Sequence, residues 1–169
     1  MSTASQDRPT EMEPEQTNAT TTIESSPDSV FEVLADPASH PAIDGTGWVR
    51  EALDATPLTN VGQVFRIAMY HDNHPDKHYE MANKVVVFDP PYAIAWKPGQ
   101  VSADTGELGF GGWVWRYDLA ATGPSRTTVT LSYDWSAVPQ PLREHIQFPP
   151  FSPDHLDNSL RHLNEIVDS

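Results

Sequence analysis

Residues 111–135 read GGWVWRYDLAATGPSRTTVTLSYDW and contain two segments in which large apolar and polar residues alternate. The large residues of each segment share one face: Trp113, Trp115, Tyr117 and Leu119 in the first, and Val129, Leu131, Tyr133 and Trp135 in the second. A period of two with aromatic and β-branched residues predicts half-buried antiparallel strands. The Gly-Pro-Ser sequence at 123–125 predicts the turn that joins them.

The wide apolar face of these strands has two alternative roles. It either fills a solid core or lines a cavity that holds an apolar ligand. The choice between these roles is the functional question, and the sequence predicts the fold more firmly than it predicts the ligand.

Composition narrows the classes of function. The chain has 169 residues, which suits one domain, and its net charge of -14 disfavours nucleic acid as a partner. It has no cysteine, which excludes disulfides and thiolate chemistry and fits a cytoplasmic protein. The N-terminus lacks the pattern of a signal peptide, and no apolar run reaches the ~20 residues of a membrane span.

The expected organisation is an acidic, disordered tail at 1–18 and one domain at 19–169. A strand is expected at 20–25, followed by a helix with Ser26 as N-cap and Pro27 in its first turn, ending before Pro37. The stretch 40–47 is expected to be irregular. The chain is expected to end in a helix, with Ser152 as its N-cap and an apolar stripe of Leu156, Leu160, Leu163 and Val167.

The middle of the chain is expected to form a run of antiparallel strands. Besides the two aromatic strands, the expected ranges are 48–55, 62–70, 77–88 and 92–97. A turn is expected at 97–99, a mobile loop at 100–112 and an irregular, proline-rich connector at 138–153. An antiparallel sheet with one terminal helix predicts an α+β fold in which the sheet wraps around that helix and leaves a pocket between them.

Several short motifs resemble the START-like superfamily, also called SRPBCC, and within it the polyketide cyclase/dehydrase-like branch of actinobacterial type. They are residues 23–28 (IESSPD) with 30–31 (VF), residues 34–37 (LADP), 40–47 (HPAIDGTG), 88–91 (FDPP), 94–96 (IAW), and Ser159, Leu160 and Leu163. The resemblance covers about residues 19–167. It implies a helix-grip (Bet v1-like) fold, with a curved sheet of about six or seven strands around a long C-terminal helix and short helices after the first strand. It carries little information about function, because this fold hosts carriers, sensors and enzymes.

The residues expected to contact a ligand share the large-residue face of the strands or the apolar stripe of the last helix. They are Phe65, Ile67, Met69, Tyr79, Met81, Asn83, Trp96, Trp113, Trp115, Tyr117, Leu156 and Leu160. Asn83 is the polar member, so a ligand, a water or a backbone group must satisfy its amide. Arg66 and Arg116 fall on the opposite face, where pairing with nearby carboxylates is expected.

Candidate catalytic groups are few. Tyr79 and Tyr117 could polarise a carbonyl, and Asp44 could act as a base or simply make the Asp-Gly-Thr-Gly turn. The segment 71–78 (HDNHPDKH) could bind a metal, but a polar hairpin loop explains it better, with His71 and Asp72 near the mouth of the pocket. No metal or cofactor is expected.

The sequence favours a protein that binds a hydrophobic small molecule, such as a lipid, a polyketide or an aromatic metabolite. The loop 100–112 and the segment 40–47 would gate the cavity. The alternative is a cyclase or dehydratase acting in the same cavity, with Tyr79, Tyr117, Asn83 or a histidine such as His71 as acid or base. A third option is an interaction or stress-response module with a filled core. We expect a monomer or a homodimer that does not insert stably into membranes.

Overall fold

The structure is a computed structural model that describes residues 15–44, 49–53, 56–70, 78–101, 105, 107–144 and 154–168. Strands and helices follow one another in this order: β1 (Gln16–Ile23), α1 (Pro27–Leu34), a 3₁₀ turn η1 (Pro37–Ser39), α2 (His40–Ile43), β2 (Val49–Ala52), β3 (Val64–Tyr70), β4 (His78–Asp89), β5 (Ala93–Val101), β6 (Leu108–Phe110), β7 (Val114–Gly123), β8 (Arg126–Asp134), α3 (Gln140–Arg143) and α4 (His155–Asp168).

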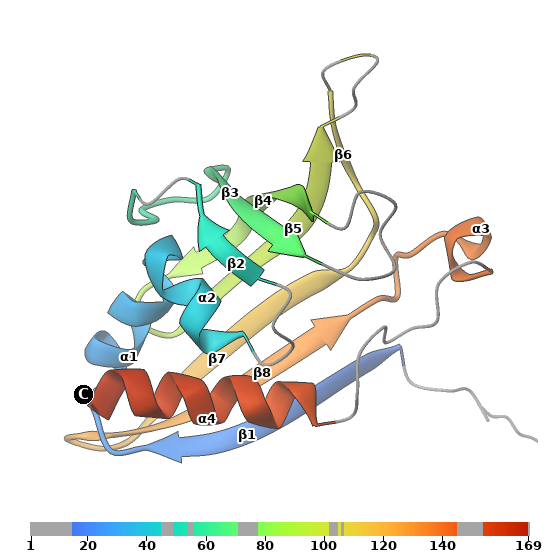
Figure 1. The fold of residues 1–169 in the computed structure, drawn as a ribbon. Helices are drawn as coiled ribbons and strands as arrows, with labels where there is room; N and C mark the ends of the chain where they lie inside the picture. Colours follow the sequence, from blue (N-terminus) through green and yellow to red (C-terminus); the bar gives the residue numbers. More distant parts are fainter. Residues whose placement is uncertain are drawn as a thin grey trace, which may run out of the picture.

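The strands form one antiparallel sheet that curls around the C-terminal helix (Figure 1). Seven strands follow the order β1-β8-β7-β5-β4-β3-β2, and β6 pairs with β5 beside that path. The helices pack mainly at one side of the sheet, where α4 contacts β1 and β8 and α1 contacts β7 and β8. This arrangement is a helix-grip fold of the α+β class, as expected from the sequence.

The two aromatic strands form the expected hairpin. β7 and β8 are antiparallel, with Trp115 opposite Tyr133 and Tyr117 opposite Leu131. Their turn lies at 124–125, as the Gly-Pro-Ser sequence predicts. Side chains directly opposite one another on the same face pack together, so the hairpin presents one continuous apolar face.

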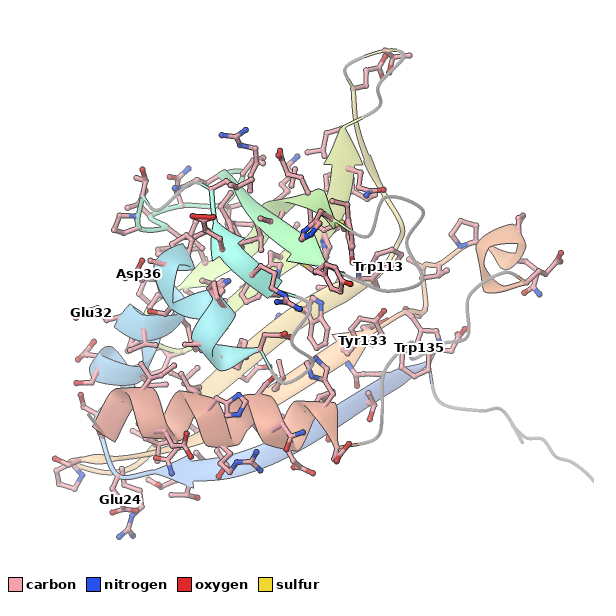
Figure 2. The ribbon with its side chains drawn as sticks, in the orientation of Figure 1. Glu24, Glu32, Asp36, Trp113, Tyr133 and Trp135 are labelled. Atoms are coloured by element: carbon pink, nitrogen blue, oxygen red, sulfur yellow. The ribbon has the colours of Figure 1, made fainter. Side chains whose placement is uncertain are left out.

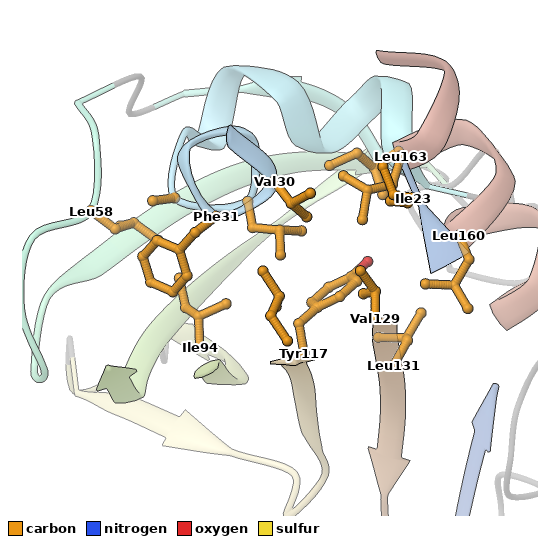
Figure 3. Packing of buried hydrophobic residues seen from close by; sticks show 14 of the residues in the cluster. Ile23, Val30, Phe31, Leu58, Ile94, Tyr117, Val129, Leu131, Leu160 and Leu163 are labelled. Carbon is orange, nitrogen blue, oxygen red and sulfur yellow. The ribbon is translucent and has the colours of Figure 1, made fainter. Parts of the chain in front are cut away.

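The two predicted helices form for the expected reasons. In α1 the Ser26 hydroxyl accepts a hydrogen bond from the Ser29 amide at 3.3 Å, which satisfies one of the amides left unpaired at a helix start. The apolar stripe of α4 turns toward the sheet, and Leu156, Leu160 and Leu163 are buried. Figure 3 shows Leu160 and Leu163 packed with Ile23, Val30 and Val129 between α1, α4 and the sheet. Ser152 lies outside the described residues.

The structure corrects the expected ends of the domain and of its first helical region. β1 begins at Gln16, so residues 16–18 belong to the sheet and not to the tail. The segment expected to be irregular from residue 40 begins with the helical turn α2, which the His40 carbonyl closes by accepting from the Asp44 amide at 3.0 Å. The proline-rich connector contains the helical turn α3, because proline is tolerated in a first turn.

The expected turn at 97–99 is wrong, and the expected loop at 100–112 contains a strand. β5 continues through Pro98 and Gly99 to Val101, and β6 pairs with its last three residues. Pro98 falls between the β5 residues paired with β7 and those paired with β6, so its missing N–H breaks no pairing on that side. Gly99 is required there because a Cβ would lie 2.5 Å from the Gly109 carbonyl oxygen.

Candidate functional site

The inner face of the sheet brings the predicted ligand residues into adjacent pairs. On β3 and β4, Met69 lies opposite Tyr79, Ile67 opposite Met81, and Phe65 opposite Asn83. On β5 and β7, Trp96 lies opposite Trp115 and Ile94 opposite Tyr117. Since β7, β5, β4 and β3 are consecutive in the sheet, these side chains form neighbouring rows on the concave side.

The predicted ligand residues divide into two groups by exposure. Phe65, Ile67, Asn83, Tyr117, Leu156 and Leu160 are buried in the core. The others remain partly exposed, and we call them the half-exposed group: Met69, Tyr79, Met81, Trp96, Trp113 and Trp115. Large apolar side chains that face inward without being sealed are the part of this surface that a ligand could contact.

The amide of Asn83 is satisfied within the protein. Asn83 is 5% exposed, and its Nδ2 donates a hydrogen bond to the Phe65 carbonyl oxygen at 3.4 Å. Of the three partners that the sequence left open, the structure therefore supplies a backbone group. Asn83 connects β4 to β3 and is a structural member of the face.

The imidazole of His40 packs against one member of the half-exposed group, Trp96. His40 stacks on Trp96 with ring centroids 5.0 Å apart, and it meets the edge of Phe65 at 5.3 Å. Its Nε2 lies 2.9 Å from the Leu34 carbonyl oxygen, so Nε2 carries the proton that is donated. Burial lowers the pKa of His40, and the Leu34 carbonyl and Asp36 oppose that shift only in part. His40 is thus a neutral ring that holds Trp96 in place.

Asp44 is fixed from two directions. Its Oδ2 accepts a hydrogen bond from the Val49 amide at 3.3 Å. The Nδ1 of His162, on α4, lies 3.2 Å from the Ile43 and Asp44 carbonyl oxygens and donates to them. The contact with Val49 ties the Asp44 carboxylate to the first residue of β2, and the contact with His162 ties the end of α2 to the terminal helix.

The carboxylate of Asp44 also acts on three side chains from three different elements. Burial is the main cause of the raised pKa of Tyr117 on β7 and of Tyr79 on β4, and the negative charge of Asp44 raises both further. Burial lowers the pKa of His155 on α4, against the opposing effects of Asp44 and Asp154. Two protonated phenols, a neutral imidazole and a carboxylate therefore gather at this part of the inner face. Figure 3 shows the Tyr117 hydroxyl directed into the interior, toward the helices.

His155 is the member of this group that the sequence interpretation missed. It is 6% exposed at the first position of α4, and its ring meets the edge of Trp115 at 5.5 Å. A signal was available, because positions 155, 156, 159, 160 and 163 follow the helical spacing of a buried stripe. The stripe was assigned from Leu156, Leu160, Leu163 and Val167, and Ser159 was named only in the family resemblance. His155 and Ser159 are buried with the leucines.

A second aromatic cluster lies at the end of the β7–β8 hairpin, where Figure 2 shows Trp113, Tyr133 and Trp135 near one another. Val138 completes it, and Trp115 connects it to the main core. At this cluster the backbone of Gly112 lies close to the backbone of Ala137. A Cβ at Gly112 would lie 2.6 Å from the Ala137 carbonyl oxygen, and the φ of 104° at Gly112 also favours glycine. Burial raises the pKa of Tyr133.

The remaining predicted polar residues have ordinary roles or lie outside the description. On the outer face Arg66 pairs with Glu80 on β4 at 3.7 Å, and Arg116 pairs with Asp118 on its own strand at 2.9 Å. His71 and Asp72, together with the rest of 71–77, lie outside the described residues. So do residues 45–47 of the proposed gate at 40–47 and residues 102–104 and 106 of the proposed gate at 100–112. Among the described residues no group of three histidines and carboxylates is arranged to hold a metal ion. Within the same part of the chain, the helices are too short and too polar to cross a membrane.

Comparison with known proteins places the fold but not the function. No protein-family profile matches the chain. The uncharacterised protein Rv0088 of Mycobacterium tuberculosis is 27% identical over 109 residues, which cover 64% of this chain and 42% of that protein. The chain thus spans less than half the length of this relative.

Several solved bacterial structures share the fold. Protein Ms6760 from Mycobacterium smegmatis has a TM-score of 0.63 and 12% identity, covering 91% of each chain. Protein CV1439 from Chromobacterium violaceum has a TM-score of 0.63 and 14% identity, covering 92% of this chain and 98% of that one. A protein from Arthrobacter aurescens has a TM-score of 0.65 and 13% identity, covering 96% of this chain and 90% of that one. At such identities the similarity is one of fold alone.

Proposed function

We propose that this protein binds a hydrophobic small molecule against the inner face of the sheet, between β3–β7 and α4. The observation that carries this proposal is the half-exposed group, in which two methionines and three tryptophans face inward without being sealed. Methionine adapts to ligands of different shapes, and tryptophan offers a large flat contact area. Such a surface suits a flat aromatic or polycyclic molecule or an acyl chain.

We also propose that the chain is a START-like protein of the polyketide cyclase/dehydrase-like branch. The helix-grip fold and the motifs at 23–37, 88–91 and 94–96 support this assignment. It adds nothing to the choice of ligand, because function on this fold depends on the residues of the site.

Native mass spectrometry tests the binding function directly. Freshly purified protein would be measured intact and again after extraction with organic solvent. We expect an additional mass that disappears on extraction, and the extract identifies the ligand class. A bare protein that also shows no thermal shift with polycyclic aromatics, alcohols or fatty acids would contradict the proposal and favour a filled-core interaction module.

A matched pair of variants locates the ligand. Met81→Trp enlarges a half-exposed inner side chain, so it should occupy the ligand's space and abolish the additional mass while the protein stays folded. Val64→Trp makes the same kind of change on β3 at a side chain that is 42% exposed and faces outward, and it should leave binding intact. Equal binding by both variants would place the ligand elsewhere.

Acid–base catalysis on the bound molecule is the second candidate function, because the inner face contains titratable groups and not apolar walls alone. His155 is neutral and could accept a proton, while the protonated phenols of Tyr79 and Tyr117 could donate a hydrogen bond to a carbonyl oxygen. Such a set suits cyclisation or dehydration of a bound polyketide-like chain. Incubating the extracted ligand or its ketone precursor with the protein should then give a product of unchanged mass if the chain only cyclises, because the ketone becomes a hydroxyl, and a product lighter by one water if that hydroxyl is eliminated. His155→Gln should slow either step.

A further inference from the structure

The half-exposed group has two ends that differ in rigidity. Met69 and Met81 lie on β3 and β4, whereas Trp96 and Trp115 lie opposite one another on β5 and β7, and we call these two indoles the tryptophan end. A methionine side chain adapts through its several rotatable bonds, while an indole is a flat and rigid ring system. How the tryptophan end receives a ligand therefore depends on whether its indoles are held in place.

The orientation of Trp96 is defined by two buried rings. The His40 imidazole stacks on the indole with ring centroids 5.0 Å apart and planes at 26°. Phe65 meets both of these rings at a steep angle, with its centroid 5.3 Å from that of His40 and 5.7 Å from that of Trp96. His40 and Phe65 are buried, and Trp96 is the partly exposed member of the three. A ligand on the inner face therefore meets an indole that is already packed from behind.

The backbone of α1 in turn fixes the imidazole. His40 Nε2 donates a hydrogen bond of 2.9 Å to the carbonyl oxygen of Leu34, the last residue of α1. The final carbonyls of a helix have no partner within the helix, so this contact satisfies one of them in a buried place. His40 could not turn away from Trp96 without breaking that bond. One side chain thus serves both as a hydrogen-bond donor to α1 and as a flat support for Trp96.

The second indole of the tryptophan end is also packed against other rings. The ring of Trp115 lies 4.5 Å from that of Tyr133 on β8 and 5.5 Å from that of His155 on α4, measured between centroids. Paired residues on neighbouring strands direct their side chains to the same face. Two adjacent indoles are therefore oriented before a ligand arrives. A flat ring can lie against such a surface without losing internal freedom, whereas a flexible chain must give up its torsional freedom to do so.

Given the binding function proposed above, on which this step rests, we propose that His40 determines the specificity of the site. It holds Trp96 in a fixed orientation and thereby makes the protein bind flat ring systems in preference to flexible chains. His40 acts through Trp96 and is a positioning residue, so the ligand need not touch it. Because the Leu34 carbonyl determines where the imidazole lies, the end of α1 takes part in shaping the site.

Two alcohols of similar hydrophobicity test this preference. Naphthalene-2-methanol has a flat ring system, and heptan-1-ol has a flexible chain with the same polar group. Isothermal titration calorimetry with the full chain at neutral pH would give both affinities. We expect naphthalene-2-methanol to bind at least ~5-fold more tightly, because ring packing adds to the burial of area and the ring has little freedom to lose.

Two substitutions of His40 separate its two contacts. His40→Gln keeps a donor for the Leu34 carbonyl and removes the ring, so it should weaken naphthalene-2-methanol by about 3- to 10-fold and change heptan-1-ol by less than ~2-fold. His40→Phe keeps a ring and removes the donor, so it should lower the melting temperature and retain the preference. The ratio of two affinities within one variant does not depend on the folded fraction, so a loss of stability alone would not move it.

A double variant tests whether His40 acts through Trp96. Trp96→Leu should remove most of the preference for the ring, and adding His40→Gln to it should change the ratio no further. His78→Gln is the matched control. His78 also packs against an aromatic ring, that of Tyr70 at 4.9 Å, but on the outer face, so its substitution should alter neither affinity.

The outcomes separate the two proposals. Binding of heptan-1-ol by the unmodified protein as tightly as naphthalene-2-methanol overturns the specificity and leaves the binding function standing. A preference that His40→Gln leaves unchanged, or that His40→Gln lowers further in the Trp96→Leu background, also overturns the role of His40. Failure of both probes, together with a bare mass, removes the binding function and the role of His40 with it.

Discussion

Two parts of the same inner face carry large apolar side chains but differ in what covers them. Beside β1 and β8, the residues Ile23, Val30, Leu34, Val129 and Leu163 are sealed by α1 and α4, and we call them the sealed core. On β3, β4, β5 and β7, and at Trp113 directly before β7, the half-exposed group presents side chains at least as large. The sealed core is aliphatic and the half-exposed group consists of Met, Tyr and Trp, and the two parts also differ in the helices above them, since α1 and α4 pack on β1, β7 and β8. A hydrophobicity pattern along a strand therefore identifies an inward face, while the covering elements determine whether that face is core or site.

Truncation in the sealed core should have the largest effect on stability. Leu163 is fully buried, so Leu163→Ala removes packed methyl groups and leaves a cavity, at a cost of about 3 kcal/mol in the free energy of unfolding. Met81→Ala removes a comparable volume from the half-exposed group and should cost about 1 kcal/mol or less while weakening ligand binding. Urea unfolding measures both. Equal costs would contradict the distinction between the two parts.

The backbone at the aromatic cluster should be the next most sensitive point. Gly112→Ala introduces a Cβ that meets the Ala137 carbonyl at 2.6 Å in a backbone conformation that favours glycine, so we expect a loss of about 2 kcal/mol. Gly109→Ala is the control, because nothing lies within 4 Å of its Cβ. Near-UV circular dichroism would report whether the tryptophans are displaced. If Gly112→Ala were as stable as the control, the cluster would be loosely packed.

Strong periodic signals predicted the framework of this fold. The alternation in 113–135 predicted β7, β8 and their turn, and the leucine spacing predicted α4. The signals failed where they were short or interrupted. β6 has only three residues, with glycines at 109, 111 and 112, and the continuation of β5 through Pro98 depends on a change of partner strand that no local pattern records.

The candidate site was predictable only in part, for a related reason. Tyr79, Tyr117 and Asp44 were identified by residue type, but their common neighbourhood arises from long-range pairing of β4, β7 and the end of α2 around α4. His155 was not predicted, because the buried stripe of α4 was recognised by its leucines. The sequence patterns of β3 and β5 do not show that Phe65 is buried and Trp96 partly exposed, because this difference depends on where the helices are placed.

A smaller effect should appear in the pH dependence of stability. Burial lowers the pKa of His40 below the 6.5 of an exposed imidazole, so the unfolded chain binds a proton there before the folded protein does. Stability is therefore lost as the pH falls through about 6.5 toward the folded pKa, and the buried His155 contributes in the same direction. The melting temperature should therefore be lower at about pH 5.5 than at about pH 7.5.

Substitution of the histidines tests the origin of that decrease. His40→Gln keeps a donor for the Leu34 carbonyl but does not titrate, so it should reduce the decrease. His78→Gln changes an exposed histidine on β4 and should leave it unchanged. An undiminished decrease in His40→Gln would assign the effect to other groups.

The outer face should respond least. Arg116 and Asp118 form a pair at 2.9 Å, with side chains 43% and 44% exposed, so water screens their attraction. Arg116→Gln should lower the free energy of unfolding by less than ~1 kcal/mol and leave ligand affinity unchanged. A loss of ligand binding in this variant would show that the two faces of β7 are coupled.

The pairing of β1 has a consequence for how the chain folds as it is synthesised. The strand at Gln16–Ile23 pairs with β8, and Thr20 and Thr130, which share a hydrogen bond at 3.2 Å, are 110 residues apart. β1 is therefore synthesised well before β8, with which it pairs, and α4, which also packs on β1, follows β8 in the chain. Contacts this distant in sequence make folding slow, and until β8 arrives the growing chain has an unpaired strand. The polar, threonine-rich sequence of β1 limits the tendency of that unpaired strand to aggregate before β8 is available.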